Sequence, residues 1–188
     1  MTTRTKLSLP HIGVLLAGGA SSRMGQDKAE LPYQGRPLIA HMLALLQGLD
    51  LDRVVVSGDR PEFAGIADIS PLRGPLGGLA SVAMQLPDAD LLVVPVDMPQ
   101  LGAALLSRLQ RAPAAACVHF VDLPLPMRLR LDAPLRHWLG DWLTDMNAPR
   151  ALHRMQTRLQ SLALPLQMAD QLQLGNANTP ADWERLSA

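Results

Sequence analysis

The stretch "LLAGGASSRMGQDK", residues 15–28, turns an apolar run into a loop of glycines and small hydroxyl side chains that ends in cations. Three glycines let the backbone approach a ligand closely, and two serines add hydroxyl donors. Arg23 and Lys28 place positive charge in the same loop. We interpret the stretch as a cradle for a phosphate chain, in which backbone N–H groups and the two cations face the phosphates. The alternative is a surface turn whose basic side chains are simply solvated.

Short aliphatic runs alternate with helical patterns around this loop. The runs typical of strands buried on both faces are residues 12–16, 53–58 and 91–96, with 115–121 as a fourth candidate. Apolar residues at helical spacing predict helices within 37–49, 74–86 and 101–112. This alternation predicts an α/β fold, a Rossmann-like three-layer α/β/α arrangement with a mostly parallel sheet. The opening loop would lie at the carboxyl edge of that sheet, where open α/β folds bind ligands.

The alternation weakens after residue 121. The segment "DLPLPMRLRL", residues 122–131, suits a half-exposed strand, and Pro124 and Pro126 would confine its start to an edge of the sheet. Three more helices are predicted, within residues 133–146, 148–159 and 178–186.

The last helix has a start signal, with Asn178 or Thr179 as its cap. Repeats and linkers are absent from the sequence, so we expect one domain over residues 1–188 with a flexible N-terminal segment, 1–10.

Composition excludes several classes of function. The chain has 17 basic and 17 acidic residues, so no overall field attracts nucleic acid or an anionic membrane surface. It contains no run of about 18 apolar residues and no apolar N-terminal leader, so we expect a cytoplasmic protein. The one cysteine, Cys117, excludes an internal disulfide and lies among alanines and a valine, which indicates a buried, inert thiol.

The opening stretch resembles "LAGGxSxRMGxDK", the signature loop of nucleotidyltransferases of the molybdenum cofactor guanylyltransferase (MobA) family. Three further segments resemble that family in the same order. "GPLGGL" (74–79) resembles its base loop "GPLAGL", "PVDMP" (95–99) its "P.D.P" element, and "NANTP" (176–180) its "N.NTP" segment. The resemblance covers about residues 12–187 and implies a single-domain nucleotidyltransferase fold.

The resemblance also implies which residues bind the nucleotide. Lys28, assisted by Arg23, would stabilise the leaving pyrophosphate as a catalytic cation, and Gly19 with the loop amides would bind the phosphates. The implied nucleotide-binding residues are Leu16, Ala17, Gly18, Gly19, Lys28, Ser57, Asp68, Gly74, Pro75, Leu76 and Asp97. At Ser57 the family tends to carry Asn, so one nucleotide contact is expected to be altered or lost.

Asp97 is the candidate metal ligand. A lone carboxylate at the end of an apolar strand, beside a phosphate loop, is suited to hold Mg²⁺ together with substrate oxygens. The resemblance implies the same role, with Mg²⁺ or Mn²⁺ as the ion. The alternative is an Asp that caps the next helix. Asn178 would lie near the acceptor or, alternatively, act as a helix cap, and "GPLGGL" could be an ordinary turn before a helix.

The activity implied by the resemblance is transfer of GMP from GTP to the terminal phosphate of molybdopterin, with release of pyrophosphate. Its partners would be GTP, a phosphorylated pterin acceptor and, transiently, molybdenum cofactor enzymes or chaperones. Relatives that use cytidine or uridine nucleotides usually read "LAAG" where this chain reads "LAGG", and Gly18 leaves room for a purine.

Other functions stay open at this point. They are a cytidylyltransferase acting on this or another phosphorylated acceptor, and a non-catalytic nucleotide-binding module. The "HP" pair that many family members show is missing near residues 121–131, which leaves an acceptor other than molybdopterin open. A nicotinamide-dependent oxidoreductase would need a glycine fingerprint and an acidic residue after the second strand, which residues 57–59 match poorly.

Overall fold

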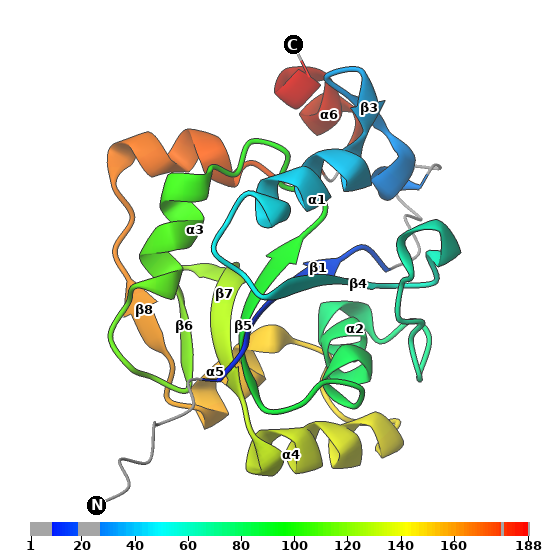
Figure 1. Ribbon diagram of the computed structural model, residues 1–188, viewed down its shortest axis with the longest axis vertical. Coiled ribbons are helices and arrows are strands. Elements are labelled where there is room, and N and C mark those ends of the chain that lie inside the picture. Colours follow the sequence, from blue (N-terminus) through cyan, green and yellow to red (C-terminus); the bar gives the residue numbers. More distant parts are fainter. Residues whose placement is uncertain (1–8, 19–26, 178, 188) are drawn as a thin grey trace, which may run out of the picture.

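A six-stranded sheet forms the centre of the molecule (Figure 1). The computed structural model describes residues 9–18, 27–177 and 179–187. The strand order is β4-β1-β5-β7-β6-β8, and β2 and β3 form a separate hairpin. The strands are β1 (His11–Leu16), β2 (Pro32–Tyr33), β3 (Arg36–Pro37), β4 (Arg53–Ser57), β5 (Ala89–Pro95), β6 (Cys117–Phe120), β7 (Leu123–Leu131) and β8 (Leu162–Leu164).

Helices cover both faces of the sheet. The α-helices are α1 (Leu38–Gln47), α2 (Gly74–Ala83), α3 (Ala103–Gln110), α4 (Ala133–Thr144), α5 (Leu152–Arg158) and α6 (Pro180–Ser187). Three short 3-10 helices are η1 (Lys28–Glu30), η2 (Pro61–Phe63) and η3 (Met168–Leu174). Figure 1 shows α1 and α3 on one side of the sheet and α2 and α4 on the other, and each side has its own apolar core. The predicted three-layer α/β/α arrangement is confirmed.

The central strands explain why the apolar runs do not alternate. β1 pairs in parallel with both β4 and β5. Successive residues of a strand point to opposite faces, and both faces are covered here, so the middle positions of these strands are apolar on both sides. Val14 and Val93 accordingly lie in the core under α2 and α4, whereas Leu15 and Val94 lie in the core under α1 and α3.

The prediction that the 122–131 strand starts at an edge is wrong. β7 lies inside the sheet, antiparallel to β5 on one side and to β6 on the other. Its two prolines are tolerated because they fall where the ladders are interrupted. The β5 ladder reaches only as far as Met127, and the β6 ladder passes from Leu123 to Met127. Pro124 and Pro126 lie between these paired positions, so no ladder hydrogen bond is lost.

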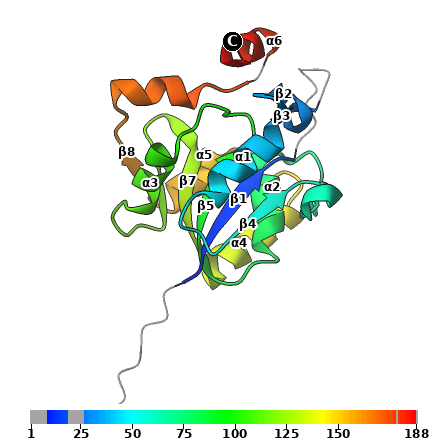
Figure 2. The ribbon, with the colours of Figure 1, turned by 45° about the horizontal axis from the view of Figure 1, so that its top comes forward.

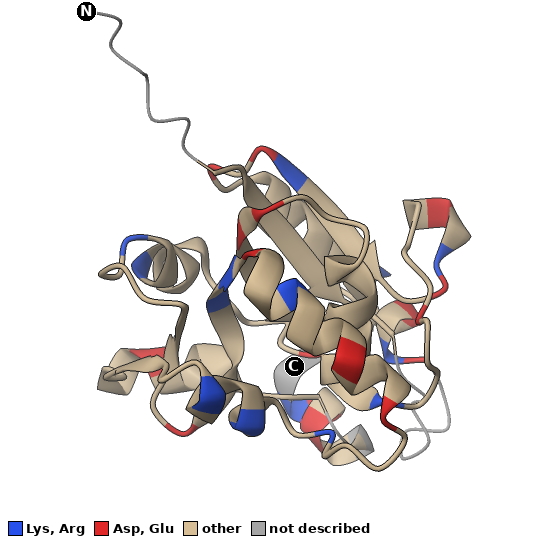
Figure 3. Ribbon diagram, turned by 90° about the horizontal axis from the view of Figure 1, so that it is seen from below, with Lys and Arg blue, Asp and Glu red and all other residues tan. Residues whose placement is uncertain are grey.

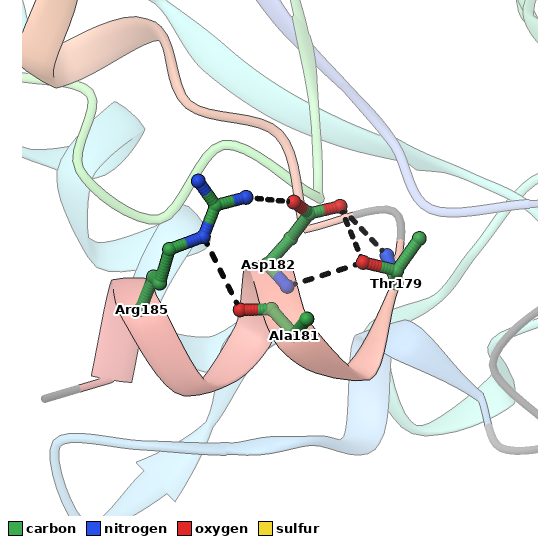
Figure 4. Close-up of polar contacts among 4 residues, drawn as sticks. All are labelled: Thr179, Ala181, Asp182 and Arg185. Carbon is green, nitrogen blue, oxygen red and sulfur yellow. Dashed lines mark hydrogen bonds and ion pairs between the residues drawn. The ribbon is translucent and has the colours of Figure 1, made fainter.

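The C-terminal helix begins with a reciprocal cap (Figure 4). The Asp182 backbone N–H donates to Thr179 Oγ1 at 3.1 Å, and the Thr179 N–H and Oγ1 both donate to Asp182 Oδ2, at 2.9 and 2.8 Å. Thr179 is therefore the cap that the sequence offered as one of two candidates. α6 lies beside the β2–β3 hairpin (Figures 1 and 2), with the Tyr33 and Trp183 ring centroids 6.0 Å apart.

Charge is distributed rather than concentrated. On the face drawn in Figure 3, basic and acidic residues are spread over several helices, strands and loops. The balanced composition is thus matched by a mixed surface on this side. Among the residues that the structure describes, no helix is both long enough and apolar enough to span a bilayer.

Candidate active site

The carboxyl ends of β1 and β5 lie side by side, with Leu16 opposite Pro95. A cavity of about 170 Å³ opens there. Its lining gathers predicted site residues from four separate segments of the chain, as expected at the carboxyl edge of an open α/β sheet. The lining residues are Leu16, Ala17, Gly18, Asp27, Lys28, Ala29, Pro75, Pro95, Val96, Asp97 and Leu125.

A cation and a carboxylate meet in this cavity. Lys28 Nζ donates to Asp97 Oδ2 at 3.1 Å, and the side chains are 17% and 23% exposed. Lys28 begins η1, which Asp27 caps by accepting a hydrogen bond from the Ala29 N–H at 3.1 Å. The two residues that the sequence singled out for phosphate and for metal are therefore direct neighbours, although they are far apart along the chain.

Asp97 is not the cap of the helix that follows it. α3 begins only at Ala103, with Gly102 in the N-cap position. The Asp97 carbonyl instead accepts a hydrogen bond from the Ala177 N–H at 2.8 Å. This contact brings Ala177, in the segment "NANTP", against the residue that carries the carboxylate.

Asp97 fits a metal that is held mainly by other oxygens. Among the described residues, no group of three or more His, Cys, Asp or Glu side chains could enclose an ion. A single carboxylate is sufficient for Mg²⁺ or Mn²⁺ when phosphate oxygens and water supply the remaining ligands. The adjacent Lys28 would then contact the same phosphates.

A second group of residues lies beside Gly18. The Ser57 hydroxyl and the Asp68 Oδ1 are both buried without a hydrogen-bond partner among the described residues. A Cβ placed on Gly78 would lie 2.4 Å from Ser57 Oγ and 3.5 Å from Asp68 Oδ1, and one placed on Gly18 would lie 3.6 Å from Asp68 Oδ1. The two glycines thus let the backbone pack closely beside two unpaired polar atoms, and a side chain at Gly78 would displace the Ser57 hydroxyl.

These unpaired atoms fit a ligand that brings hydrogen-bond donors. Leaving a buried acceptor unsatisfied costs about 1–3 kcal/mol, so a partner from outside the chain is favoured. Burial also raises the pKa of the Asp68 carboxyl. The structure therefore brings Ser57 and Asp68 together, as the resemblance implied, and adds Gly78, which the sequence analysis did not single out. Its only signal in the sequence was that it is the third glycine of "GPLGGL".

The segment "GPLGGL" is both a turn and the start of a helix. Gly74 has a φ of +68°, in the region that favours glycine, and is the first residue of α2. Pro75 lines the cavity. Leu76, by contrast, is fully buried in the core between α2 and the sheet, so only its backbone could contact a nucleotide there.

Three predicted site residues, Gly19, Arg23 and Asn178, lie outside the described residues, so their roles stay predictions. The expectation for Cys117 is confirmed, because the thiol is completely buried and burial raises its pKa to about 12. Two of the histidines have structural contacts. His41 Nε2 lies 3.0 Å from the Pro99 carbonyl, and His119 Nδ1 lies 2.8 Å from the Phe120 carbonyl.

The fold and the site together define a class, the α/β nucleotide-binding proteins with a cation and a carboxylate at the strand ends. Comparison with known proteins is more specific. The model of the "MobA-like NTP transferase domain" matches residues 13–159. The chain belongs to this family of nucleotidyltransferases.

Individual relatives agree with this assignment. A protein of Xanthomonas euvesicatoria pv. vesicatoria named molybdenum cofactor guanylyltransferase is 51% identical, over 96% of each chain. The structure of molybdopterin-guanine dinucleotide biosynthesis protein A from Archaeoglobus fulgidus superimposes with a TM-score of 0.74 at 18% identity, covering 94% of this chain and 96% of that one. A Mycobacterium tuberculosis protein solved in complex with manganese superimposes with a TM-score of 0.65 at 17% identity, covering 95% and 98%.

Proposed function

We propose that this chain transfers GMP from GTP to the terminal phosphate of molybdopterin and releases pyrophosphate. The observation that carries the proposal is the Lys28–Asp97 pair, 3.1 Å apart in the cavity at the strand ends. The pair offers one positive and one negative group to the same phosphate chain. The name of the relative that is 51% identical, a molybdenum cofactor guanylyltransferase, supports the choice of donor and acceptor.

The reaction would be an in-line attack by an acceptor phosphate oxygen on the α-phosphorus of GTP. A new P–O bond forms on one side, the bond to the bridging oxygen breaks on the other, and pyrophosphate leaves with that electron pair. A phosphate nucleophile is already ionised at neutral pH, so no general base is needed. Catalysis then depends on positioning and on offsetting negative charge, which is the task of Lys28 with the help of Arg23.

Asp97 would hold Mg²⁺ or Mn²⁺ through its carboxylate. The ion would supply positive charge to the phosphate oxygens, which complete its coordination together with water. Lys28 pairs with the same carboxylate at 3.1 Å, so it already lies where it can contact a phosphate bound to that ion. Both residues would then act on the leaving pyrophosphate.

Asp68 and Ser57 would recognise the base. The edge of guanine presents two adjacent donors, N1–H and N2–H, which one carboxylate can accept together. Cytosine presents a single amino donor beside two acceptors, which a carboxylate repels. The unpaired Asp68 Oδ1, which lies beside the side-chain-free Gly18, therefore favours GTP over CTP.

A second cavity beside the first fits the acceptor. It has a volume of about 580 Å³ and shares Pro75 with the nucleotide cavity. Arg150 and His153 supply cationic or donor groups, while Leu123 and Pro124 at the start of β7 supply apolar surface. A phosphorylated ring compound needs this combination. Asn178 near the acceptor, transient protein partners and a cytoplasmic location stay predictions.

Pyrophosphate release with GTP and molybdopterin is the test. Lys28→Ala should lower turnover by about two orders of magnitude or more, because a cation that acts on the transition state is lost. The matched control is Arg130→Ala, which removes a half-exposed cation 3.7 Å from Asp90, near the opposite end of β5, and should stay fully active. Near-normal turnover of Lys28→Ala would refute its role. A preference for CTP would favour the cytidylyltransferase, and nucleotide binding without product would favour a binding module.

A further inference from the structure

Arg60 joins two points on either side of the glycine-rich segment. Its Nε and Nη2 both donate to the Ala17 carbonyl, at 3.4 and 3.1 Å. Its Nη1 lies 2.5 Å from Asp27 Oδ2 and 3.6 Å from Glu30 Oε1. The Arg60 side chain is only 13% exposed, so these contacts are largely shielded from water. One guanidinium therefore holds the residue that follows β1 and the residue that precedes Lys28.

The loop that carries Arg60 is itself tightly held. The Arg60 carbonyl accepts hydrogen bonds from the N–H groups of Phe63 and Gly65, at 3.0 and 2.8 Å. The Gly58 N–H donates to the Ile66 carbonyl at 2.8 Å, which closes the loop onto β4. A Cβ on Gly65 would lie 2.5 Å from the Gly58 carbonyl oxygen and 2.8 Å from Arg60 Cβ, so the loop fits only around glycine. The guanidinium thus projects from a fixed point.

The contacts of Arg60 lead directly to the phosphate-binding pair. Asp27 accepts from the Ala29 N–H at 3.1 Å and so fixes the start of η1, whose first residue is Lys28. Ala17 and Asp27 both line the nucleotide cavity, whereas Arg60 is not among the described residues that line it. The hydrogen bond from Arg60 also lowers the pKa of the Asp27 carboxyl, so the ion pair persists at neutral pH.

We propose that Arg60 is a positioning residue for nucleotidyl transfer. It sets the distance between the end of β1 and the start of η1, so that Lys28 stays opposite Asp97. This proposal rests on the proposed function for the role of Lys28, and it extends that function to a residue which acts through its contacts with Ala17, Asp27 and Glu30. Arginine is required because its planar fork can serve a carbonyl and a carboxylate at once, whereas lysine offers a single point charge.

The first test is a double-mutant cycle in which kcat and KM are measured. Arg60→Ala should lower kcat about tenfold to a hundredfold with a smaller change in KM for GTP, since misplacement of a catalytic group affects mainly the transition state. Arg60→Lys should be intermediate. In a Lys28→Ala background the Arg60→Ala change should cost less than about threefold, because its effect passes through Lys28. Equal losses in both backgrounds, or a kcat for Arg60→Ala within twofold of wild type, would overturn the proposal.

The control is Arg136→Ala. Arg136 has the same kind of contacts at the far end of α2, because it donates to the Ala83 and Leu86 carbonyls at 3.2 and 3.1 Å and lies 2.9 Å from Asp88. Its loss should lower the melting temperature as much as the loss of Arg60, with kcat and KM unchanged. If both variants reduced activity only in proportion to the unfolded fraction, Arg60 would be merely structural.

The second test does not need the reaction. Inorganic tripolyphosphate probes the phosphate site whatever the base or acceptor, so it separates failure of this proposal from failure of the proposed function. Asp27→Asn breaks the ion pair but keeps the charge of Arg60 and the ability to cap η1. Positioning predicts that tripolyphosphate binds Asp27→Asn and Arg60→Ala about five- to tenfold more weakly. Unchanged or tighter binding to Asp27→Asn would mean that Arg60 acts through charge alone, and would overturn the proposal.

Discussion

Replacing Asp68 by asparagine is expected to stabilise the nucleotide-free protein and to weaken its binding of GTP. In the absence of nucleotide, Asp68 Oδ1 is buried without a partner among the described residues, and burial raises the pKa of the carboxyl. The carboxylate is therefore held in its charged form at neutral pH against its surroundings. Asparagine has the same shape without the charge, so most of this cost disappears.

The stability gain can be bounded from the geometry. An unsatisfied buried acceptor costs about 1–3 kcal/mol, and the variant still buries one polar atom at the same place, so a gain of about 1 kcal/mol is reasonable. For a chain of this size that corresponds to a rise of about 2–4 °C in the melting temperature.

The pH dependence has a definite sign. The folded pKa of Asp68 lies above the ordinary value of 3.8, so the folded state binds more protons than the unfolded state between those two values. Wild-type stability is therefore reduced at neutral pH and recovers as the pH falls through the raised pKa. The advantage of Asp68→Asn should be complete at neutral pH and should vanish below the ordinary value.

Binding should change in the opposite direction. The variant keeps one acceptor oxygen but turns a donor amide toward guanine, so at least one charge-assisted hydrogen bond, worth about 1.5–3 kcal/mol, is lost. The Kd for GTP should rise about 10- to 150-fold, and the Kd for CTP should rise less.

Thermal unfolding at several pH values, together with calorimetric titration of GTP and CTP, would test both parts. Asp59→Asn is the matched control, because Asp59 is exposed in a nearby loop and should change neither quantity. Destabilisation of Asp68→Asn at neutral pH, or unchanged GTP affinity, would refute the assignment of Asp68 to the base.

Two further substitutions probe separate parts of the site, and a labelling experiment probes the core. Gly18→Ala would place a Cβ 3.6 Å from Asp68 Oδ1 and 3.2 Å from Gly58 Cα. The kcat/KM should therefore fall about tenfold more for GTP than for CTP. Equal losses for the two nucleotides would contradict the purine pocket. Asp97→Asn should lower metal-dependent turnover about 100-fold or more with little change in melting temperature, while Asp90→Asn, in the strand that precedes Asp97, stays active. An active variant that melts early would indicate a structural carboxylate. Cys117, whose thiol pKa is raised to about 12 by burial, should react with iodoacetamide at mildly alkaline pH only after unfolding in urea; rapid labelling of the folded protein would contradict its burial.

The three adjacent parallel strands could be predicted from the sequence because burial on both faces leaves near-continuous aliphatic runs, whereas no strand was predicted at β8. The aliphatic runs at 12–16, 53–58 and 91–96 coincide with β1, β4 and β5 to within two residues at either end. Parallel strands then place their following loops at one edge, so the sequence alone indicates that Lys28 and Asp97 lie near one another.

The position of β7 could not be predicted in the same way. Proline in a strand indicates an edge only when every position needs a ladder hydrogen bond. The interruption between Leu123 and Met127 depends on how β6 and β5 end, which no local pattern reports. Arg60 escaped prediction for a related reason. Its partner Ala17 is 43 residues away, and an arginine in a polar loop looks solvated until its partners are known.

A local pattern also cannot explain why this chain has Gly77 where the family pattern "GPLAGL" has alanine. A Cβ on Gly77 would lie 2.5 Å from Arg73 Cβ, so alanine would displace that side chain. The Arg73 side chain is buried, with 1% of the residue exposed. Its Nη2 donates to the Trp142 and Asp145 carbonyls at 2.9 Å each, and its guanidinium lies 4.2 Å from the centre of the Trp142 ring. Breaking a buried, charged donor set of this kind is costly. The glycine therefore accommodates an arginine that ties the start of α2 to the end of α4 and so fixes the segment that carries Gly74 and Pro75.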